Sequence, residues 1–115
     1  MSDPARTRTV TWADPAVHAW RATTASGLDT LRKVIAGELP HGPMAELMGL
    51  RLVEAEEGLA VFAATPAEFH YNPAGHVHGG FAATILDSAM GCAVYSTIPL
   101  GGNYTTVEIK VNYLK

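Results

Sequence analysis

The sequence predicts an α+β fold in which antiparallel strands surround one long apolar helix. Three observations lead to this expectation. Helical periodicity dominates residues 14–48, an alternating pattern follows at residues 50–65, and a proline-free apolar run at residues 81–98 leads into a second alternating stretch. The order of a helix, a hairpin, a buried helix and a long strand is typical of the α+β class. A chain of 115 residues leaves room for one domain.

Composition and charge narrow the class of protein. The chain is 48% hydrophobic and 17% charged, and its net charge of -3 with scattered basic residues gives no reason to expect a nucleic-acid partner. Cys92 is the single cysteine, which excludes an intramolecular disulfide and favours a reducing compartment, so we expect a cytoplasmic protein. Its place in an apolar helix indicates packing rather than nucleophilic chemistry. Residues 1–11 lack the apolar core of a signal peptide, and the apolar helix carries Asp87, so we expect no membrane partner.

The chain opens on a polar stretch. Residues 1–13 are expected to form a flexible arm, and the domain itself is expected over residues 14–115. Asp14 followed by Pro15 is an N-cap acid before a proline at the first helical position, which predicts a first helix.

Two further helices are predicted before the hairpin. Ser26 begins the first of them, with Asp29 at the position that a glutamate takes in a capping box, and Gly37 ends it. Its apolar face comprises Leu28, Leu31, Val34 and Ile35. A short helix from Met44 to Met48 follows and ends at Gly49.

Residues 50–65 alternate with a period of two, which predicts a β-hairpin. An acidic turn, Glu56-Glu57-Gly58, separates the two strands. Adjacent carboxylates in a turn point apart into solvent, so this pair is a poor candidate for acid–base catalysis. We expect the inward-facing residues to be Leu50, Leu52 and Ala55 on the first strand and Leu59, Val61 and Ala63 on the second.

The rest of the chain is organised around residues 72–91, NPAGHVHGGFAATILDSAMG. Asn72 and Pro73 form a turn, and a helix is expected from Phe81 through Ile98, ended by Pro99. Its apolar residues surround the axis so completely that we expect the helix to be buried. Its first free N–H groups should belong to Gly79, Gly80 and Phe81.

One carboxylate, Asp87, interrupts this helix. A charge in a buried helix is costly, so Asp87 is either neutralised by a structural partner or kept for chemistry, and we favour chemistry. The glycine pair at the start of the helix would let a ligand oxygen reach backbone N–H donors at the positive end of the helix dipole, which is the geometry of an oxyanion site. The alternative for Gly79 and Gly80 is a tight entry turn with close packing.

The spacing of Gly79 and Asp87 predicts that two chains contribute to each site. Gly79 and Asp87 are eight residues apart, a rise of about 12 Å along a helix, so they cannot both touch one carbonyl group. If both are catalytic, each works with its counterpart from another copy, which predicts a two-fold homodimer with composite sites.

The last part of the chain predicts a strand. Gly101-Gly102-Asn103 forms a turn, and residues 104–114 then alternate clearly. Thr106, Glu108, Lys110 and Asn112 share one side, and Val107, Ile109, Val111 and Tyr113 share the other.

These motifs resemble the hotdog-fold acyl-CoA thioesterases, in particular their PaaI-type branch. That family has an asparagine, a short spacer, His-Gly-Gly and an acidic residue nine positions after the histidine, in an alanine-rich helix; here these are Asn72, His78-Gly79-Gly80 and Asp87. The resemblance implies an antiparallel sheet wrapped around the long helix. It also implies two further strands after residue 115, so we expect the sheet to lack its last two strands in this chain.

The resemblance further implies hydrolysis of an acyl-CoA thioester to a carboxylate and coenzyme A, without a metal or organic cofactor. The Gly79 N–H would polarise the thioester carbonyl, and His78 would orient that turn or the substrate. Asp87 of the opposite subunit would act as general base or nucleophile. Asn72 would hold the water or the thioester, and Thr106 would steady the nucleophile. The assembly implied is a homodimer, with a homotetramer formed as a dimer of dimers.

The acyl pocket is expected next to the helix start, where Gly80 and Phe81 would contact the substrate. An aryl or medium-chain acyl group would fit beside the small residues Ala82, Ala83 and Ala89, although tight helix packing calls for the same residues.

Three alternatives stay open. His70, His76 and His78 could hold a metal ion, although no cysteine or carboxylate nearby completes a tetrahedral set. A hotdog hydratase or dehydratase would need a histidine and an acid converging on one substrate carbon. A non-catalytic acyl-CoA sensor would keep the fold and the pocket without turnover, but it would gain nothing from Asp87.

Overall fold

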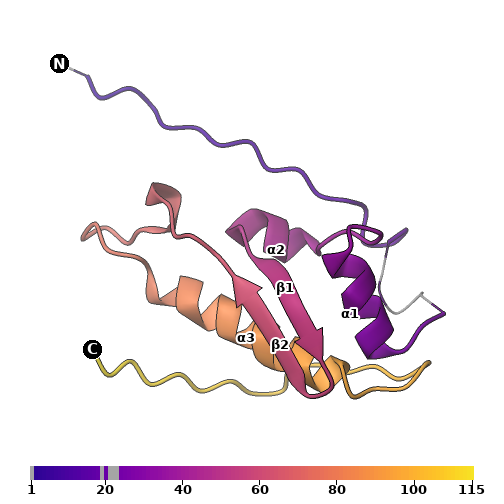
Figure 1. Cartoon of the computed structure of the whole chain (residues 1–115). Helices are drawn as coiled ribbons and strands as arrows, with labels where there is room; N and C mark the ends of the chain where they lie inside the picture. Colours follow the sequence, from indigo (N-terminus) through magenta and orange to yellow (C-terminus); the bar gives the residue numbers. More distant parts are fainter. Residues whose placement is uncertain (1, 19, 21–23) are drawn as a thin grey trace.

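The computed structural model describes residues 2–18, 20 and 24–115. It is an α+β structure, as predicted, with a long helix α3 (Gly79–Tyr95) packed on a two-stranded antiparallel sheet of β1 (Arg51–Glu56) and β2 (Leu59–Ala63). Helix α1 (Gly27–Ile35) packs on β1, and α2 (Pro43–Met48) precedes that strand (Figure 1). In the described part of the chain, no helix is both long enough and apolar enough to cross a membrane.

Helix α1 begins where the sequence predicts. The Oγ of Ser26 accepts a hydrogen bond from the Asp29 N–H at 3.2 Å, which caps the helix. A Cβ on Gly27 would lie 1.8 Å from the carbonyl oxygen of Tyr95, so only glycine allows α1 to approach the end of α3 this closely. The Gly27 N–H also donates to the Ile98 carbonyl at 2.9 Å, which joins the start of α1 to the segment just after α3.

Helix α2 and the hairpin confirm the next predictions. Gly49 follows α2 with a φ of +74°, the left-handed conformation that ends a helix. Leu50, Leu52 and Ala55 are all buried, as the alternation predicts. An irregularity in the pairing between Leu52 and Glu54 lets Leu52 and Ala55 face the same side although they are three residues apart.

The prediction for the inner face of β2 was wrong by one residue. Leu59 and Val61 are exposed on the outer face, whereas Ala60 and Phe62 pack against the core. The register explains this, because cross-strand partners share a face and Phe62 pairs with the buried Leu52.

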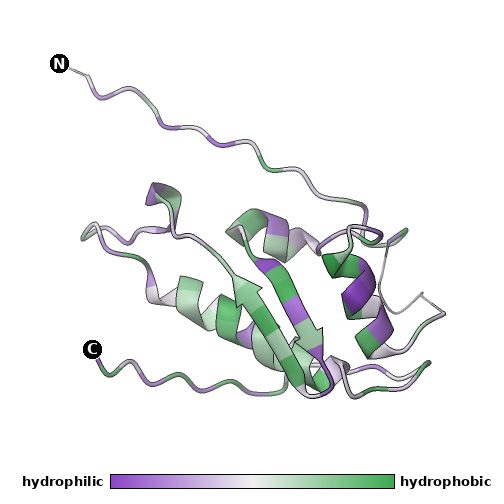
Figure 2. Ribbon diagram, in the orientation of Figure 1, coloured by the Kyte–Doolittle hydropathy of each residue, from purple (hydrophilic) through white to green (hydrophobic). Residues whose placement is uncertain are grey.

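The core lies between α1, the hairpin and the carboxyl-terminal half of α3. The hairpin turn is fixed to α3, because the Gly58 N–H donates to Ser96 Oγ at 2.8 Å. Figure 2 shows β2 as a largely hydrophobic strand facing α3, while α1 combines apolar and strongly polar residues. The buried cluster consists of Leu31, Val34, Leu52, Ala55, Cys92 and Tyr95.

Helix α3 differs from its prediction in two ways. It runs from Gly79 to Tyr95, so it starts two residues earlier and ends three residues earlier than expected. It is also not buried all round, because the sheet covers only one of its sides. On its open side a stripe spaced four residues apart is about half exposed, namely Leu86 at 43%, Met90 at 51% and Val94 at 54%.

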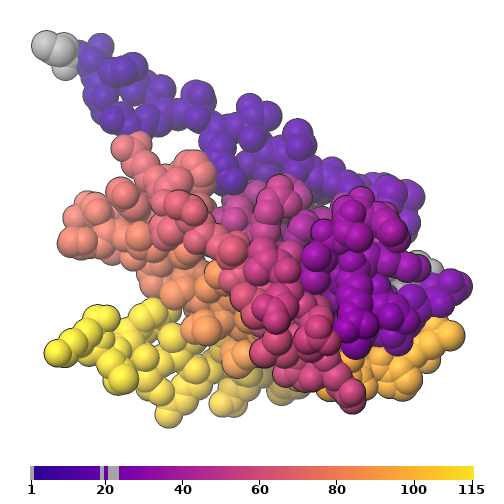
Figure 3. Space-filling view, viewed as in Figure 1, coloured from indigo at the N-terminus to yellow at the C-terminus, as the bar shows by residue number. Residues whose placement is uncertain are grey.

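The strand predicted at residues 104–114 is extended but unpaired. It forms no β-bridge in the described part of the chain, because an extended backbone becomes a strand only beside a partner that takes its hydrogen bonds. The segment instead runs along α3 on the side away from the hairpin, and Figure 3 shows it as a thin ridge at the edge of the molecule. Its alternation of polar and apolar residues is visible in Figure 2.

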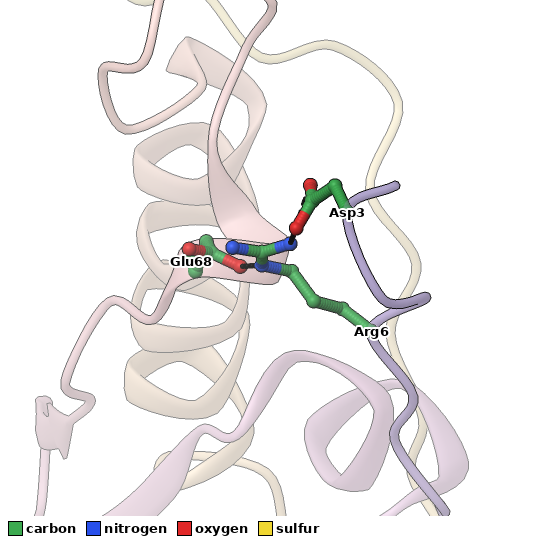
Figure 4. A network of polar contacts seen from close by, with 3 residues as sticks. All are labelled: Asp3, Arg6 and Glu68. Carbon is green, nitrogen blue, oxygen red and sulfur yellow. Dashed lines mark hydrogen bonds and ion pairs between the residues drawn. The ribbon is translucent and has the colours of Figure 1, made fainter. Parts of the chain in front are cut away.

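The amino-terminal arm is extended over residues 2–13. The helix predicted at Asp14 is a single turn in the described residues, capped by a 2.8 Å bond from the Ala16 N–H to the Asp14 carboxylate; its expected continuation through residues 19 and 21–23 lies outside them. The arm contacts the body of the protein through Arg6, which lies between Asp3 and Glu68 (Figure 4).

Candidate active site

Hydrogen bonds to His78 hold the first turn of α3 in place. Its imidazole Nδ1 accepts the Gly80 N–H at 2.8 Å, and its carbonyl oxygen accepts the Phe81 N–H at 3.0 Å. Two of the three N–H groups that the sequence offered to a ligand are therefore satisfied within the chain. The Gly79 N–H has no acceptor among the described residues, which leaves it at the positive end of a 17-residue helix.

Asn72 forms the turn that leads into this helix. Its side-chain Oδ1 accepts hydrogen bonds from the N–H groups of Ala74, at 2.9 Å, and His76, at 3.1 Å. Gly75 allows the chain to reverse with a φ of +83°. The carbonyl end of the Asn72 carboxamide is thus engaged in the loop, which leaves its NH₂ group as the part able to meet a ligand.

The turn returns the chain on itself, so that residue 70 lies beside residue 78. Tyr71 and Val77 form an antiparallel bridge, and the His78 N–H donates to the His70 carbonyl at 2.8 Å. A pocket of about 290 Å³ opens at this junction. It is lined by Met48, Phe69, His70, Tyr71, His78, Gly80 and Phe81.

His70 is the one side chain of this pocket with an unsatisfied buried atom. It belongs to the 3₁₀ turn η2 (Glu68–His70) and is 8% exposed, with its ring centroid 4.5 Å from those of Phe69 and Phe81. Its Nδ1 accepts the Ala67 N–H at 2.9 Å, so a neutral ring carries its proton on Nε2. That Nε2 has no partner in the described part of the chain, an arrangement that costs about 1–3 kcal/mol.

The second half of the candidate site lies in the middle of α3. The Thr106 hydroxyl donates to the Asp87 carboxylate at 2.8 Å, so two residues selected from the sequence meet across 19 positions. They line a groove of about 430 Å³ between α3 and the segment 104–109. The expectation of a fully buried Asp87 was wrong for this chain, because the open side of α3 leaves the carboxylate only half-buried.

The two halves of the candidate site, at the start of α3 and around Asp87, are separate within one chain. The groove around Asp87 and the pocket around His78 and Gly80 have no lining residue in common. Gly79 and Asp87 occupy one helix at a separation of eight residues, or about 12 Å of rise.

Cys92 is part of the packing on the inner side of α3. It is 4% exposed, and burial raises the pKa of its thiol to about 11, with a hydrogen bond to Tyr104 acting in the opposite direction. Burial is also the largest cause that raises the pKa of Tyr104 to about 12. A protonated, enclosed thiol fits the structural interpretation of this cysteine and not a nucleophile.

The three candidate metal-binding histidines serve different purposes. Nδ1 of His70 and Nδ1 of His78 accept backbone N–H groups, while His76 is exposed on the loop. Over residues 2–18, 20 and 24–115, no group of three or more histidine, cysteine, aspartate or glutamate side chains is placed to hold a metal ion.

Sequence reasoning missed two contributors to the pocket. His70 was considered only as a metal ligand, although the Asn-Pro turn with Gly75 predicts a reversal that brings residue 70 back to residue 78. Arg8 carried no local signal, because its guanidinium reaches the Phe69 ring, at 3.9 Å from the centroid, across about 60 residues of sequence.

Comparison with known proteins agrees with this geometry. Residues 74–115, which include the start of α3, Asp87 and Thr106, match the Thioesterase superfamily. A protein of Halobacterium salinarum named "Putative esterase" is 46% identical over 43 residues, which cover 36% of this chain and 28% of that protein. The match thus spans little more than a quarter of that relative's length. No solved structure matches the chain. Residues 74–115 are therefore similar to the Thioesterase superfamily, and the two-stranded antiparallel sheet with its long helix is consistent with a hotdog fold.

Proposed function

We propose that this protein is a PaaI-type acyl-CoA thioesterase that hydrolyses an aryl or medium-chain acyl-CoA to the carboxylate and coenzyme A. The observation that carries the proposal is the Gly79 N–H, which is left without an acceptor in the described chain at the start of a long helix. A donor in that position stabilises the negative charge that develops on a carbonyl oxygen during acyl transfer. The superfamily match over residues 74–115 supports the same class of reaction.

The proposed chemistry divides between the two halves of the site. Asp87 removes a proton from water, or attacks directly, while the Thr106 hydroxyl holds the carboxylate in place. The carbonyl oxygen becomes negatively charged and is held by the Gly79 N–H. Collapse of the tetrahedral intermediate expels the coenzyme A thiolate, which takes up a proton. His78 keeps the helix start in register, and the free NH₂ of Asn72 faces the bound water or thioester in this scheme.

The scheme requires two chains. Because Gly79 and Asp87 are about 12 Å apart along one helix, we propose a homodimer in which each site takes its oxyanion donor from one subunit and its carboxylate from the other. The half-exposed stripe of Leu86, Met90 and Val94 beside Asp87, and the unpaired extended segment next to it, supply apolar surface for such an interface. A dimer of dimers is the proposed larger assembly.

Thiol release from a panel of phenylacetyl-, hydroxybenzoyl- and straight-chain acyl-CoAs tests the proposal. Wild type should turn over at least one member of the panel, and Asp87→Asn should lose about 10²–10⁴-fold in kcat while it still binds the substrate. Saturable binding of acyl-CoA by wild type without any thiol release would instead identify a non-catalytic acyl-CoA sensor.

A further inference from the structure

The pocket beside Gly79, at the start of α3, is lined by a buried side-chain donor. His70 is more than nine-tenths buried, and its Nδ1 is committed to the Ala67 N–H at 2.9 Å. The proton of the neutral ring is therefore on Nε2, at the opposite edge of the imidazole, where the described part of the chain offers it no acceptor. Buried donors without a partner are rare in native proteins, and each calls for an explanation.

The backbone holds His70 next to the helix start. The His70 carbonyl accepts the His78 N–H at 2.8 Å, and Gly79 is the next residue in the chain. His70 and His78 line the same pocket. The two donors that lack acceptors in the described chain, Gly79 N–H and His70 Nε2–H, therefore come from segments joined by a direct hydrogen bond.

The His70 imidazole lies between two aromatic side chains, of which one is exposed and the other is buried. Phe69 lies edge-on to the His70 ring at 4.5 Å and is itself 55% exposed, whereas Phe81 on the other side is buried at 7% exposure. A ligand that turns Phe69 outward would gain access to the imidazole without disturbing the core. The neighbouring Arg8 packs over Phe69 at 3.9 Å, and its guanidinium donates to the Leu47 carbonyl at 2.6 Å.

From this arrangement we infer that His70 is a substrate-binding residue, whose Nε2–H donates to the carbonyl oxygen of the acyl thioester together with the Gly79 N–H. The inference rests on the proposed thioesterase function. Two convergent donors are what an oxyanion requires, because a single N–H leaves part of the developing charge without a partner. Displacement of Phe69 accompanies binding of the acyl group.

Two matched variants distinguish the role of the His70 Nδ1 from that of its Nε2. In His70→Asn the carboxamide oxygen can still accept the Ala67 N–H, but no donor reaches the position of Nε2. In His70→Gln the longer side chain can place an NH₂ group near that position. His70→Asn should lower kcat on a reactive acyl-CoA about 100-fold, with KM changed much less, and His70→Gln should recover part of the loss.

Binding of two non-hydrolysable probes tests the inference independently of turnover. One probe is the ketone in which a methylene replaces the thioester sulfur of phenylacetyl-CoA, and the other is the S-phenethyl thioether, which has no carbonyl. Wild type should prefer the ketone by roughly tenfold, and His70→Asn should lose most of this preference, keeping the part that the Gly79 N–H provides, while its thioether affinity stays unchanged. Thermal unfolding of each variant checks that it folds, and His70→Gln provides the second variant if Asn does not.

The outcomes distinguish the two proposals. Normal turnover and an unchanged ketone preference in His70→Asn would overturn the role of His70 and leave the thioesterase standing. A ketone preference that depends on His70, in a wild-type protein that releases no thiol, would support the donor and overturn the enzymatic function. Binding of neither probe by wild type would overturn both.

Discussion

The start of α3 and its middle, eight residues further along, differ in how distant in sequence the residues are that hold each of them in place. At the start, His78, Gly79 and Gly80 are consecutive residues, and their backbone N–H groups are oriented by hydrogen bonds within residues 70–81, while the Tyr113 hydroxyl adds one distant contact by donating to the Gly79 carbonyl. In the middle, Asp87 depends on Thr106, 19 residues away in an extended segment without a β-partner in the described chain. The oxyanion half is therefore set mainly by local hydrogen bonds, whereas the carboxylate half lies on an open side of the helix.

This difference predicts that the helix start is held within one chain, whereas the surroundings of Asp87 would change on association with a second copy. Local hydrogen bonds fix the helix start in an isolated chain. Asp87 lies beside half-exposed Leu86 and Met90, so a neighbour on that side would change both its burial and its basicity. Changes at the helix start should accordingly act on catalysis alone, and changes near Asp87 should act on catalysis and on packing together.

The largest effect is expected from removal of the Gly79 N–H. Gly79→Pro deletes this donor at the first helical position, where proline is well tolerated and the preceding His78 already has a compatible φ of -63° and ψ of 138°. We expect kcat to fall by about 10²–10³-fold with little loss of stability. The control is Gly79→Ala, which keeps the N–H and adds a Cβ 3.4 Å from the exposed Tyr113 side chain, whose hydroxyl donates to the residue 79 carbonyl. Equal activity of the two variants would contradict the assignment of Gly79.

A smaller effect is expected for the reactivity of Cys92, because the segment 104–109 lies against the middle of α3. Native Cys92 should react with a thiol reagent at pH 8 on the order of a hundredfold more slowly than the unfolded chain, because its pKa of about 11 leaves very little thiolate. Tyr104→Ala should speed this reaction, since Tyr104 packs on Gly91 and its loss reduces the burial that raises the thiol pKa, an effect larger than the loss of its own pKa-lowering hydrogen bond. Labelling of the folded protein at the unfolded rate would mean that the segment 104–109 does not lie against α3.

The smallest effect concerns the hydroxyl beside the carboxylate. Thr106→Val keeps the shape but removes the 2.8 Å bond to Asp87, and we expect kcat to fall about tenfold, the equivalent of one ordinary hydrogen bond. Thr106→Ser retains the hydroxyl and should stay close to wild type. Equal kcat values for Val and Ser at this position would show that Thr106 does not position the carboxylate.

The sequence predicted most of the local structure correctly. The Ser26 cap, the Gly49 stop and the Gly58 hairpin all depend on residues within a few positions of each other, and all three were confirmed. The inward side of β2 was wrong because it depends on the cross-strand register, which pairs Ala60 with Ala55 and Phe62 with Leu52 and which alternation alone does not reveal.

What the sequence could not supply was long-range contact. Residues 104–114 have the pattern of a strand, but a pattern does not provide the partner that takes its hydrogen bonds. The apolar circumference of α3 predicted burial on all sides, whereas one sheet covers one side and leaves Met90 half exposed. His70 escaped notice because its significance depends on an unpaired atom, which only coordinates reveal.

We propose that each site combines Gly79 of one subunit with Asp87 of another. Mixing two inactive proteins, Gly79→Pro and Asp87→Asn, tests it most directly. After random exchange, half of the dimers contain one chain of each kind and one of their two sites is intact, so thiol release should return to about a quarter of the wild-type rate. Mixed dimers that form, as judged by native mass spectrometry, but release no more thiol than the parent variants would place both residues in one chain and contradict the account.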